Sequence, residues 1–400
     1  MMMEKRVSPE TALARCLPCI KPVDGVVLPV EEVWQRVVAA DIYTAVDIPL
    51  FSHSLVDGLV LHLSDLDRLQ RDKEILLSIT GTIGAGDLDS PALVAGETME
   101  IMTGARLPEG AGAIVKREEV PVKNRWAYFN QGVQPGANIK KRGSFLKSGD
   151  LLAAAGEVLG ASQIEIIAAA GMPQILVYNI PAVYVINTGS ELILPGEERQ
   201  AGQIFASNKA FYYSLVKAAG CDPIGGKRPV KDQIGEIAGE LVEGIKCSKL
   251  LIISGGTAEG EYDLVQAAFH QIGARMIFDG LDLKPGRHTA AAEKDGVLLI
   301  NLPGNPGAGA IIFEILVKPL LRKLRGSTDY QNSWFELSPQ DNDLPLTKRR
   351  TMARARGEIR KGQINARMID KGSQSLTGGM LQLIVDLDPS SPAIKALLID

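Results

Sequence analysis

The chain has 400 residues, of which 46% are hydrophobic and 22% charged, and its formal net charge is −4 at pH 7. This length predicts two to four domains, and the apolar content is sufficient for large buried cores. The weakly negative charge argues against a protein dedicated to nucleic acid. No window of about 18 apolar residues predicts a membrane span, and residues 1–11 lack the apolar core of a signal peptide, so we expect a cytoplasmic protein.

The first part of the chain predicts helices, then short strands. Helical spacing occurs over 9–17 and 28–40, and Glu31 and Glu32 lie in the first turn of the second segment, where carboxylates suit the helix dipole. Between about 48 and 137, short alternating runs are separated by Gly and Pro. We expect strands there over 58–63, 75–79, 96–102, 113–117 and 127–130. A helix is predicted over 162–170.

One pattern occurs three times between residues 182 and 310: a β-branched apolar run, a glycine-rich loop, and a helix-like stretch. The apolar runs cover 182–186, 250–253 and 297–300. Helices are expected over 208–219, 231–243, 262–271 and 307–324.

Continuous apolar runs of this kind are typical of parallel strands that are buried on both faces. The loops that follow such strands meet at the carboxyl edge of the sheet, where open α/β folds bind ligands. Glycine lets backbone N–H groups approach an anion, and helix N-termini favour negative charge. The three loops therefore indicate a site for a phosphorylated or oxyanionic ligand, although each taken alone is equally compatible with a tight structural turn.

After residue 326 the pattern becomes β again, with strands expected over 354–359, 364–369 and 381–387. We therefore predict an α/β plus β fold of several domains. The linking domain comprises 1–47 and 138–178, a β-rich insert domain spans 48–137, an α/β domain spans 179–326, and a small C-terminal β-barrel-like domain spans 327–400.

Five motifs occur in a fixed order along the chain. They are Pro49-Leu50-Phe51-Ser52-His53-Ser54-Leu55-Val56-Asp57-Gly58, Thr103-Gly104-Ala105-Arg106-Leu107-Pro108, Thr188-Gly189-Ser190-Glu191-Leu192, Ser254-Gly255-Gly256 with Asp263, and Leu302-Pro303-Gly304-Asn305-Pro306. In sequence and spacing these motifs resemble the molybdopterin molybdotransferase family (MoeA, and the related domain of gephyrin).

The resemblance implies an elongated homodimer whose MogA-like α/β domain holds a pterin-nucleotide site shared with the other subunit. It implies that molybdate, or tungstate, is inserted into adenylylated molybdopterin with release of AMP, and that Mg²⁺ assists. A molybdopterin adenylyltransferase or a molybdoenzyme is an expected partner, whereas nucleic acid and membranes are not.

The resemblance also assigns roles to individual residues. Catalytic roles fall on Asp57, Thr103, Glu191 and Asp263. Pterin-nucleotide binding falls on Gly189, Ser254, Gly255, Gly256, Lys284, Arg287, Pro303, Gly304 and Asn305. Metal binding falls on Asp232 and Asp263. Each polar residue also has a structural interpretation, as a turn residue, a helix cap or a solvated side chain.

The chain departs from the family pattern at several positions. Phe145, Ala258, Arg287, His288 and Gln363 stand where the family has, respectively, an acidic residue, a serine, a lysine, a proline and an arginine. Ala258 and Gln363 cannot supply a charge, whereas arginine at 287 is a sound oxyanion ligand. The pterin-nucleotide half of the site is therefore predicted to be better preserved than the oxyanion half.

Three functions remain open at the level of sequence. The first is an active molybdotransferase. The second is a non-catalytic or altered relative that carries a pterin cofactor or matures one molybdoenzyme. The third is a nucleotide-cleaving enzyme of the CinA-like kind or a molybdopterin adenylyltransferase, against which the long N-terminal module with Asp57 and Thr103 argues.

Overall fold

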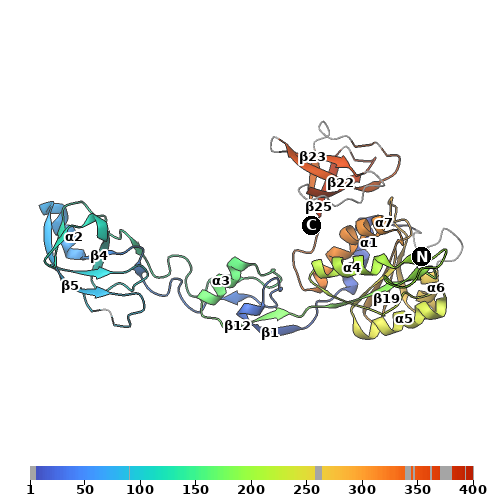
Figure 1. Cartoon of the computed structure of the whole chain (residues 1–400), viewed down its shortest axis with the longest axis horizontal. Coiled ribbons are helices and arrows are strands. Elements are labelled where there is room, and N and C mark those ends of the chain that lie inside the picture. Colours follow the sequence, from blue (N-terminus) through green and yellow to red (C-terminus); the bar gives the residue numbers. More distant parts are fainter. Residues whose placement is uncertain are drawn as a thin grey trace.

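The structure is a computed structural model that describes residues 6–89, 91–256, 264–337, 344–345, 347–360, 363–369, 381–391 and 393–399. Within these ranges, none of the helices combines the length and apolar character needed to cross a bilayer. The chain is elongated (Figure 1), with a β-rich unit at one end, the α/β unit at the other, and a small linking unit between them. A C-terminal sheet stands beside the α/β unit, and the whole confirms the predicted α/β plus β fold class.

The α/β unit is built on a sheet of six described strands in the order β16-β13-β17-β20-β19-β18. Their bounds are β13 (Ala182–Asn187), β16 (Asp222–Ile224), β17 (Leu250–Ser254), β18 (Arg275–Asp279), β19 (Ala290–Lys294) and β20 (Val297–Leu302). The strands β16, β13, β17 and β20 run parallel, whereas β19 and β18 are antiparallel to their neighbours. Every residue of β17 and β20 is buried, which explains their apolar runs over 250–253 and 297–300.

Helices cover both faces of this sheet. One face packs against α1 (Pro9–Cys16), α4 (Ser207–Ala218), and the helical stretch of α7 (Pro306–Ile312), the π-helical turn η4 (Phe313–Val317) and α8 (Lys318–Leu324). The other face packs against α5 (Ile234–Cys247) and α6 (Leu264–Gln271). A short parallel pair, β14 (Leu192–Ile193) and β15 (Ile204–Phe205), projects beside α4.

The N-terminal helix belongs to the α/β core. Val7, Ala12, Cys16 and Ile20 are buried in the same cluster as the sheet residues, and Val7 bridges Leu281. This differs from the expectation that all of 1–47 forms part of the linking domain, because the apolar face of α1 finds its partner surface on the α/β sheet. The 3₁₀ turn η1 (Leu17–Cys19) follows it. The remaining domain bounds stay a prediction.

The β-rich unit contains a second sheet of six described strands in the order β7-β4-β6-β5-β9-β8. Their bounds are β4 (Gly58–His62), β5 (Ile75–Ile83), β6 (Glu97–Ile101), β7 (Ala111–Lys116), β8 (Val122–Lys123) and β9 (Trp126–Phe129), with η3 (Arg117–Glu119) between β7 and β8. An amphipathic helix, α2 (Leu63–Asp72), packs on this sheet through Leu66 and Leu69.

The linking unit consists of small antiparallel pairs and one helix. It contains β1 (Gly25–Pro29) with β12 (Gln174–Tyr178), β2 (Ile42–Tyr43) with β11 (Leu151–Ala153), the turn η2 (Val30–Glu32) and α3 (Ala161–Ala169). The short pair of β3 (His53–Ser54) with β10 (Ile139–Lys140) packs on the β-rich unit, where His53 bridges Arg106 and Ile139 joins the cluster of Val60. The helix expected over 28–40 is therefore wrong, since this segment begins as a strand and continues as a single 3₁₀ turn.

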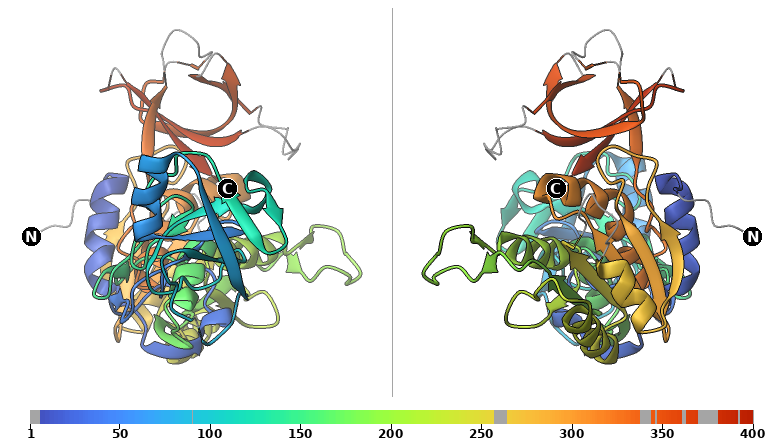
Figure 2. Two further views of the ribbon diagram at one scale, coloured as in Figure 1. Left: turned by 90° about the vertical axis from the view of Figure 1, so that its left-hand side faces the viewer. Right: turned by 90° about the vertical axis from the view of Figure 1, so that its right-hand side faces the viewer.

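The C-terminal sheet has five described strands in the order β21-β25-β24-β22-β23. They are β21 (Trp334–Leu337), β22 (Thr351–Arg360), β23 (Gln363–Met368), β24 (Leu381–Leu387) and β25 (Ile394–Ile399), and every pairing is antiparallel. The end-on views in Figure 2 show that this sheet is curled and projects from one side of the α/β unit.

Candidate active site

The three glycine-rich loops meet in one cleft of about 390 Å³ at the carboxyl ends of β13, β17 and β20. Seven of the residues assigned from the sequence line it: Gly189, Glu191, Asp232, Ser254, Gly255, Gly256 and Gly304. The parallel register aligns Asn187 with Ser254 and Ser254 with Leu302, so the strands end at the same level. This alignment brings together loops that begin 67 and 48 positions apart in the sequence, counted from Asn187 to Ser254 and from Ser254 to Leu302.

Two glycines allow the loop after β17 to approach its neighbour closely. Gly255 and Gly256 have φ angles of +111° and +69°, in the region that side chains with a Cβ rarely adopt. A Cβ on Gly255 would overlap the carbonyl oxygen of Thr188. Glycine therefore lets this loop pack directly against Thr188, and with no side chain on either residue, a phosphate could approach the backbone N–H groups that line the cleft.

Asn208, at the start of α4, ties two of these loops together. Its Nδ2 donates to Ser254 Oγ at 2.9 Å and to the Gly304 carbonyl oxygen at 2.8 Å. Both Asn208 and Ser254 are buried. The sequence placed Asn208 after the third motif but assigned it no role, and the structure identifies it as the residue that fixes the spacing between the loops.

Several buried polar atoms of the cleft make no hydrogen bond to any residue that the structure describes. They are Asn187 Nδ2, Thr188 Oγ1 and Asp232 Oδ1. Leaving a buried polar atom unpaired costs about 1–3 kcal/mol, so such atoms are rare unless they have another purpose. Their presence together in one glycine-lined cleft indicates that this surface is shaped to bind a polar ligand.

Asp232 is held by a reciprocal pair of contacts with Ser190. The Ser190 N–H donates to Asp232 Oδ2, and the Asp232 N–H donates to Ser190 Oγ, both at 3.0 Å. Oδ1 of Asp232 is left without a hydrogen bond to any described residue, and Glu191 contributes a second carboxylate to the same cleft. Asp263, assigned from the sequence to catalysis and metal binding, lies outside the described residues. Among those that are described, no three His, Cys, Asp or Glu side chains gather as a metal cluster.

Lys284, Arg287 and Pro303 line a different cavity, of about 460 Å³, rather than the rim of the glycine-lined cleft. Pro303 and Gly304, adjacent in the chain, separate the two spaces. The second cavity also receives Arg6, Arg349 and Arg350, which the motifs did not indicate. Asn305 lines neither space, and its side chain caps α7 by accepting from the Ala308 N–H at 3.1 Å.

Asp57 and Thr103 form a pair in the β-rich unit. Asp57 Oδ1 accepts hydrogen bonds of 2.7 Å from both the N–H and the hydroxyl of Thr103. These bonds, from the Thr103 backbone first and its side chain second, lower the pKa of the Asp57 carboxyl below its ordinary value. Within one chain, the linking unit lies between this pair and the α/β cleft (Figure 1).

The positions that depart from the family pattern are scattered. Phe145 is exposed in the segment that returns from the β-rich unit, and Gln363 is exposed at the start of β23. His288 lines the cavity of Lys284 and Arg287. Ala258 lies outside the described residues.

Comparison with known proteins places the chain in one family. Residues 7–171 match the description "MoeA N-terminal region (domain I and II)", and residues 184–323 match "Probable molybdopterin binding domain". The molybdopterin molybdenumtransferase of Haemophilus influenzae is 30% identical over 306 residues, which cover 76% of this chain and 74% of that protein. The enzyme of the same name from Bacillus subtilis is 29% identical over 328 residues, which cover 80% and 76%.

A solved structure agrees with this. The molybdopterin biosynthesis MoeA protein of a Pyrococcus species superposes with a TM-score of 0.79 at 25% identity and covers 98% of this chain and 99% of that one. The chain therefore belongs to the molybdopterin molybdenumtransferase (MoeA) family.

Proposed function

We propose that this protein acts in molybdenum cofactor biosynthesis as a molybdotransferase: it inserts molybdate, or tungstate, into adenylylated molybdopterin and releases AMP. The observation that carries the proposal is the set of unpaired buried polar atoms on Asn187, Thr188 and Asp232 in the glycine-lined cleft. Family membership supplies the substrate class, and the cleft has the donors that a nucleotide phosphate requires.

The glycine-lined cleft and the neighbouring cavity would each bind a different substrate. Backbone N–H groups at Gly255 and Gly256 would hold the phosphoanhydride, whereas Lys284 and Arg287 would hold the oxyanion. As the two dithiol sulfurs of the pterin bind molybdenum, their two protons combine with one molybdate oxygen, which leaves as water. One water molecule adds across the anhydride, so AMP departs and the two waters balance.

A divalent cation fits the carboxylates of the cleft. Asp232 Oδ1 is unpaired and Glu191 lines the same space, and hard cations such as Mg²⁺ prefer oxygen ligands of this kind. Asp232 and Glu191 would hold the ion, with Asp263 as the further ligand implied by the family. The cation would neutralise the charge that develops on the departing phosphate.

We infer that a second copy of the chain completes the site. Asp57 and Thr103 are separated from the cleft of their own chain by the linking unit (Figure 1). Large apolar side chains are exposed on the loop that leads to Asp57, namely Leu50, Phe51 and Leu55, as expected of a surface that another protein covers.

The function is tested by incubating the protein with adenylylated molybdopterin, Mg²⁺ and molybdate and measuring AMP. Release of AMP that depends on molybdate is expected, and Glu191→Gln should reduce it strongly. An exposed residue of α5, changed as Glu236→Gln, is the matched control. Binding of the adenylylated pterin without AMP release would instead favour the non-catalytic carrier.

The shared site is tested by mixing two inactive variants, Asp57→Asn and Glu191→Gln, under conditions that allow subunits to exchange. Random pairing makes half of the dimers mixed, and each mixed dimer has one intact site of two, so activity should return to roughly a quarter of the unmodified value. If each chain carries a complete site, mixing restores nothing.

A further inference from the structure

The cavity that contains Lys284 and Arg287 is formed by four separate segments of the chain, one of which contributes Pro303 and Ala308. Arg6 enters from the N-terminus, the loop over 281–288 forms one wall, and Arg349 and Arg350 enter from the segment that leads into β22. The lining contains one carboxylate, that of Asp282, and several cationic side chains. The cavity is therefore suited to a small dianion.

The backbone fixes the segment of Arg349 against the lysine loop. The Lys284 N–H donates to the Arg350 carbonyl oxygen at 3.1 Å, and the Met352 N–H donates to the Lys284 carbonyl oxygen at 2.8 Å. Lys284 and Thr351 form a parallel bridge. The Lys284 N–H thus contacts the backbone of Arg350, which directly follows Arg349. The segment of Arg349 is therefore held against the loop of Lys284, although the two residues are 65 positions apart in the sequence.

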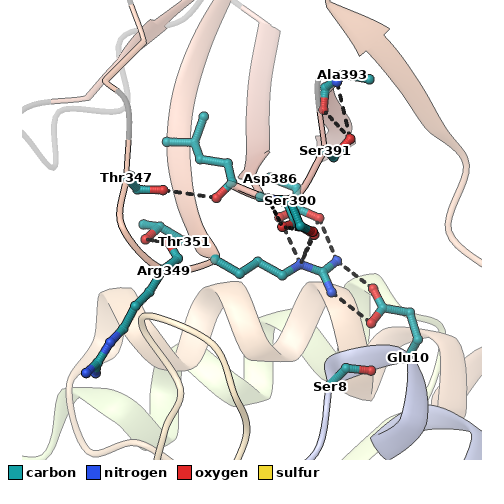
Figure 3. A network of polar contacts seen from close by, with 12 residues as sticks. Ser8, Glu10, Thr347, Arg349, Thr351, Asp386, Ser390, Ser391 and Ala393 are labelled. Carbon is teal, nitrogen blue, oxygen red and sulfur yellow. Dashed lines mark hydrogen bonds and ion pairs between the residues drawn. The ribbon is translucent and has the colours of Figure 1, made fainter.

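Arg350 is paired with carboxylates, of which Glu10 and Asp386 are labelled in Figure 3. Its Nη1 donates to Glu10 Oε2 at 2.9 Å, its Nη2 donates to Asp386 Oδ2 at 2.6 Å, and Asp388 lies 3.8 Å away. The hydrogen bonds to Glu10 and then to Asp386 raise the pKa of the Arg350 guanidinium above its ordinary value. With its charge balanced in this way, Arg350 anchors the segment and has little charge left for a ligand.

Arg349 differs from Arg350 in the contacts of its guanidinium. Its carbonyl oxygen accepts a hydrogen bond from the Thr351 hydroxyl at 2.9 Å, but its guanidinium extends away from Glu10 and Asp386 (Figure 3). This guanidinium forms no hydrogen bond or ion pair with a residue that the structure describes. Because the contacts of Arg350 hold the backbone of Arg349 in place, little main-chain conformational entropy is lost when a ligand binds.

We propose that Arg349 binds the oxyanion substrate, together with Lys284 and Arg287. This inference rests on the proposed function for the identity of the ligand, molybdate or tungstate. A planar guanidinium with several donors matches a tetrahedral oxyanion well. Arg349 therefore supplies cationic charge that the family motifs of this chain do not indicate.

The test compares Arg349→Gln with Lys348→Gln, each measured by calorimetric titration of molybdate into the whole protein. Both changes remove one exposed positive charge, but Lys348 does not line the cavity. Loss of a charge-assisted hydrogen bond should weaken molybdate binding about tenfold to a hundredfold in Arg349→Gln and leave Lys348→Gln within about twofold. Equal affinities in the two variants would overturn the proposal.

A second measurement separates this inference from the proposed function. At saturating adenylylated molybdopterin, Arg349→Gln should raise the molybdate concentration that gives half-maximal AMP release and change the maximal rate little. If the unmodified protein releases no AMP, the proposed function fails, whereas the molybdate titration still decides the role of Arg349. Arg349→Lys retains the positive charge without the planar guanidinium and should bind molybdate with intermediate affinity. An affinity no better than that of Arg349→Gln would show that the positive charge does not contribute to binding.

Discussion

Replacement of Asn208 by alanine should loosen the cleft and destabilise the α/β unit. The change removes two buried hydrogen bonds, to Ser254 Oγ and to the Gly304 carbonyl oxygen, at 2.9 and 2.8 Å. Each acceptor left without a donor costs about 1–3 kcal/mol, and the hydroxyl can reorient, so we expect a total of about 2–3 kcal/mol. For a unit of this size, that corresponds to a melting temperature lower by roughly 4–12 °C.

The measurement is differential scanning calorimetry, which resolves the unfolding of separate units in a multidomain chain. Ser214→Ala is the matched control, because it lies on the same helix and loses a hydrogen bond to Ala210 at an exposed position. Ser214→Ala should change the melting temperature by no more than about 2 °C. If Asn208→Ala and Ser214→Ala have the same melting temperature, the bridge between the loops contributes nothing to their positions and the reasoning is refuted.

Two further outcomes follow from the geometry. Gly309→Ala should destabilise the protein by about 1–3 kcal/mol in the same calorimetric assay, because its Cβ would overlap the buried Tyr212 Oη, whereas Gly239→Ala, with open space around its Cβ, should stabilise α5 by roughly 0.5–1 kcal/mol. If Gly309→Ala raised the stability as Gly239→Ala is expected to do, the contact with Tyr212 would not limit the packing of α7. Thr103→Val removes one donor to Asp57, so the pKa of Asp57 measured by NMR titration should rise toward its ordinary value. Since the folded-state pKa is lowered, the Asp57–Thr103 contact stabilises the fold above the ordinary aspartate pKa and is lost as pH falls through the lowered value. An unchanged Asp57 pKa in Thr103→Val would leave the backbone N–H of Thr103 as the sole cause.

The parallel core of the α/β unit could be predicted from the sequence because its strands are buried on both faces. The runs expected over 182–186, 250–253 and 297–300 correspond to β13, β17 and β20. Most positions of such strands are filled by apolar residues, so burial leaves a local signature, and Asn187, Ser254 and Asn301 are the buried polar exceptions near the strand ends. The loops that follow them were identifiable for the same reason, since positive φ angles at Gly255 and Gly256 require glycine.

The segment over 28–40 was misjudged because its structure is set by a distant partner. Gly25–Pro29 pairs with Gln174–Tyr178, a contact across nearly 150 residues that no local pattern reveals. Gln35 then adopts a φ of +59°, which a helix does not allow. The pair Glu31 and Glu32 favours a first helical turn, and one 3₁₀ turn does form there, but the chain leaves the helical conformation directly afterwards.

The helix α2 was missed although its sequence contains a signal. Leu63, Leu66 and Leu69 recur at three-residue spacing, and Leu66 and Leu69 are buried against the sheet. The residue that caps the helix is His62, whose Nδ1 accepts from the Ser64 N–H, rather than one of the common capping residues. Because the surrounding segments alternate like strands, the short helical period between them was easily overlooked.

The charge of the oxyanion cavity is the part of the site that sequence comparison describes least well. The motifs draw attention to Gln363, where the family has arginine, and so predict a weakened pocket. In the structure, Gln363 is exposed at the start of β23 and does not line the cavity of Lys284 and Arg287. The cavity acquires its additional cations through contacts between distant segments, which a motif cannot encode. A prediction of oxyanion affinity should therefore begin from Arg349 and the anchoring of Arg350, and restoring arginine at position 363 alone should have less effect than removing Arg349.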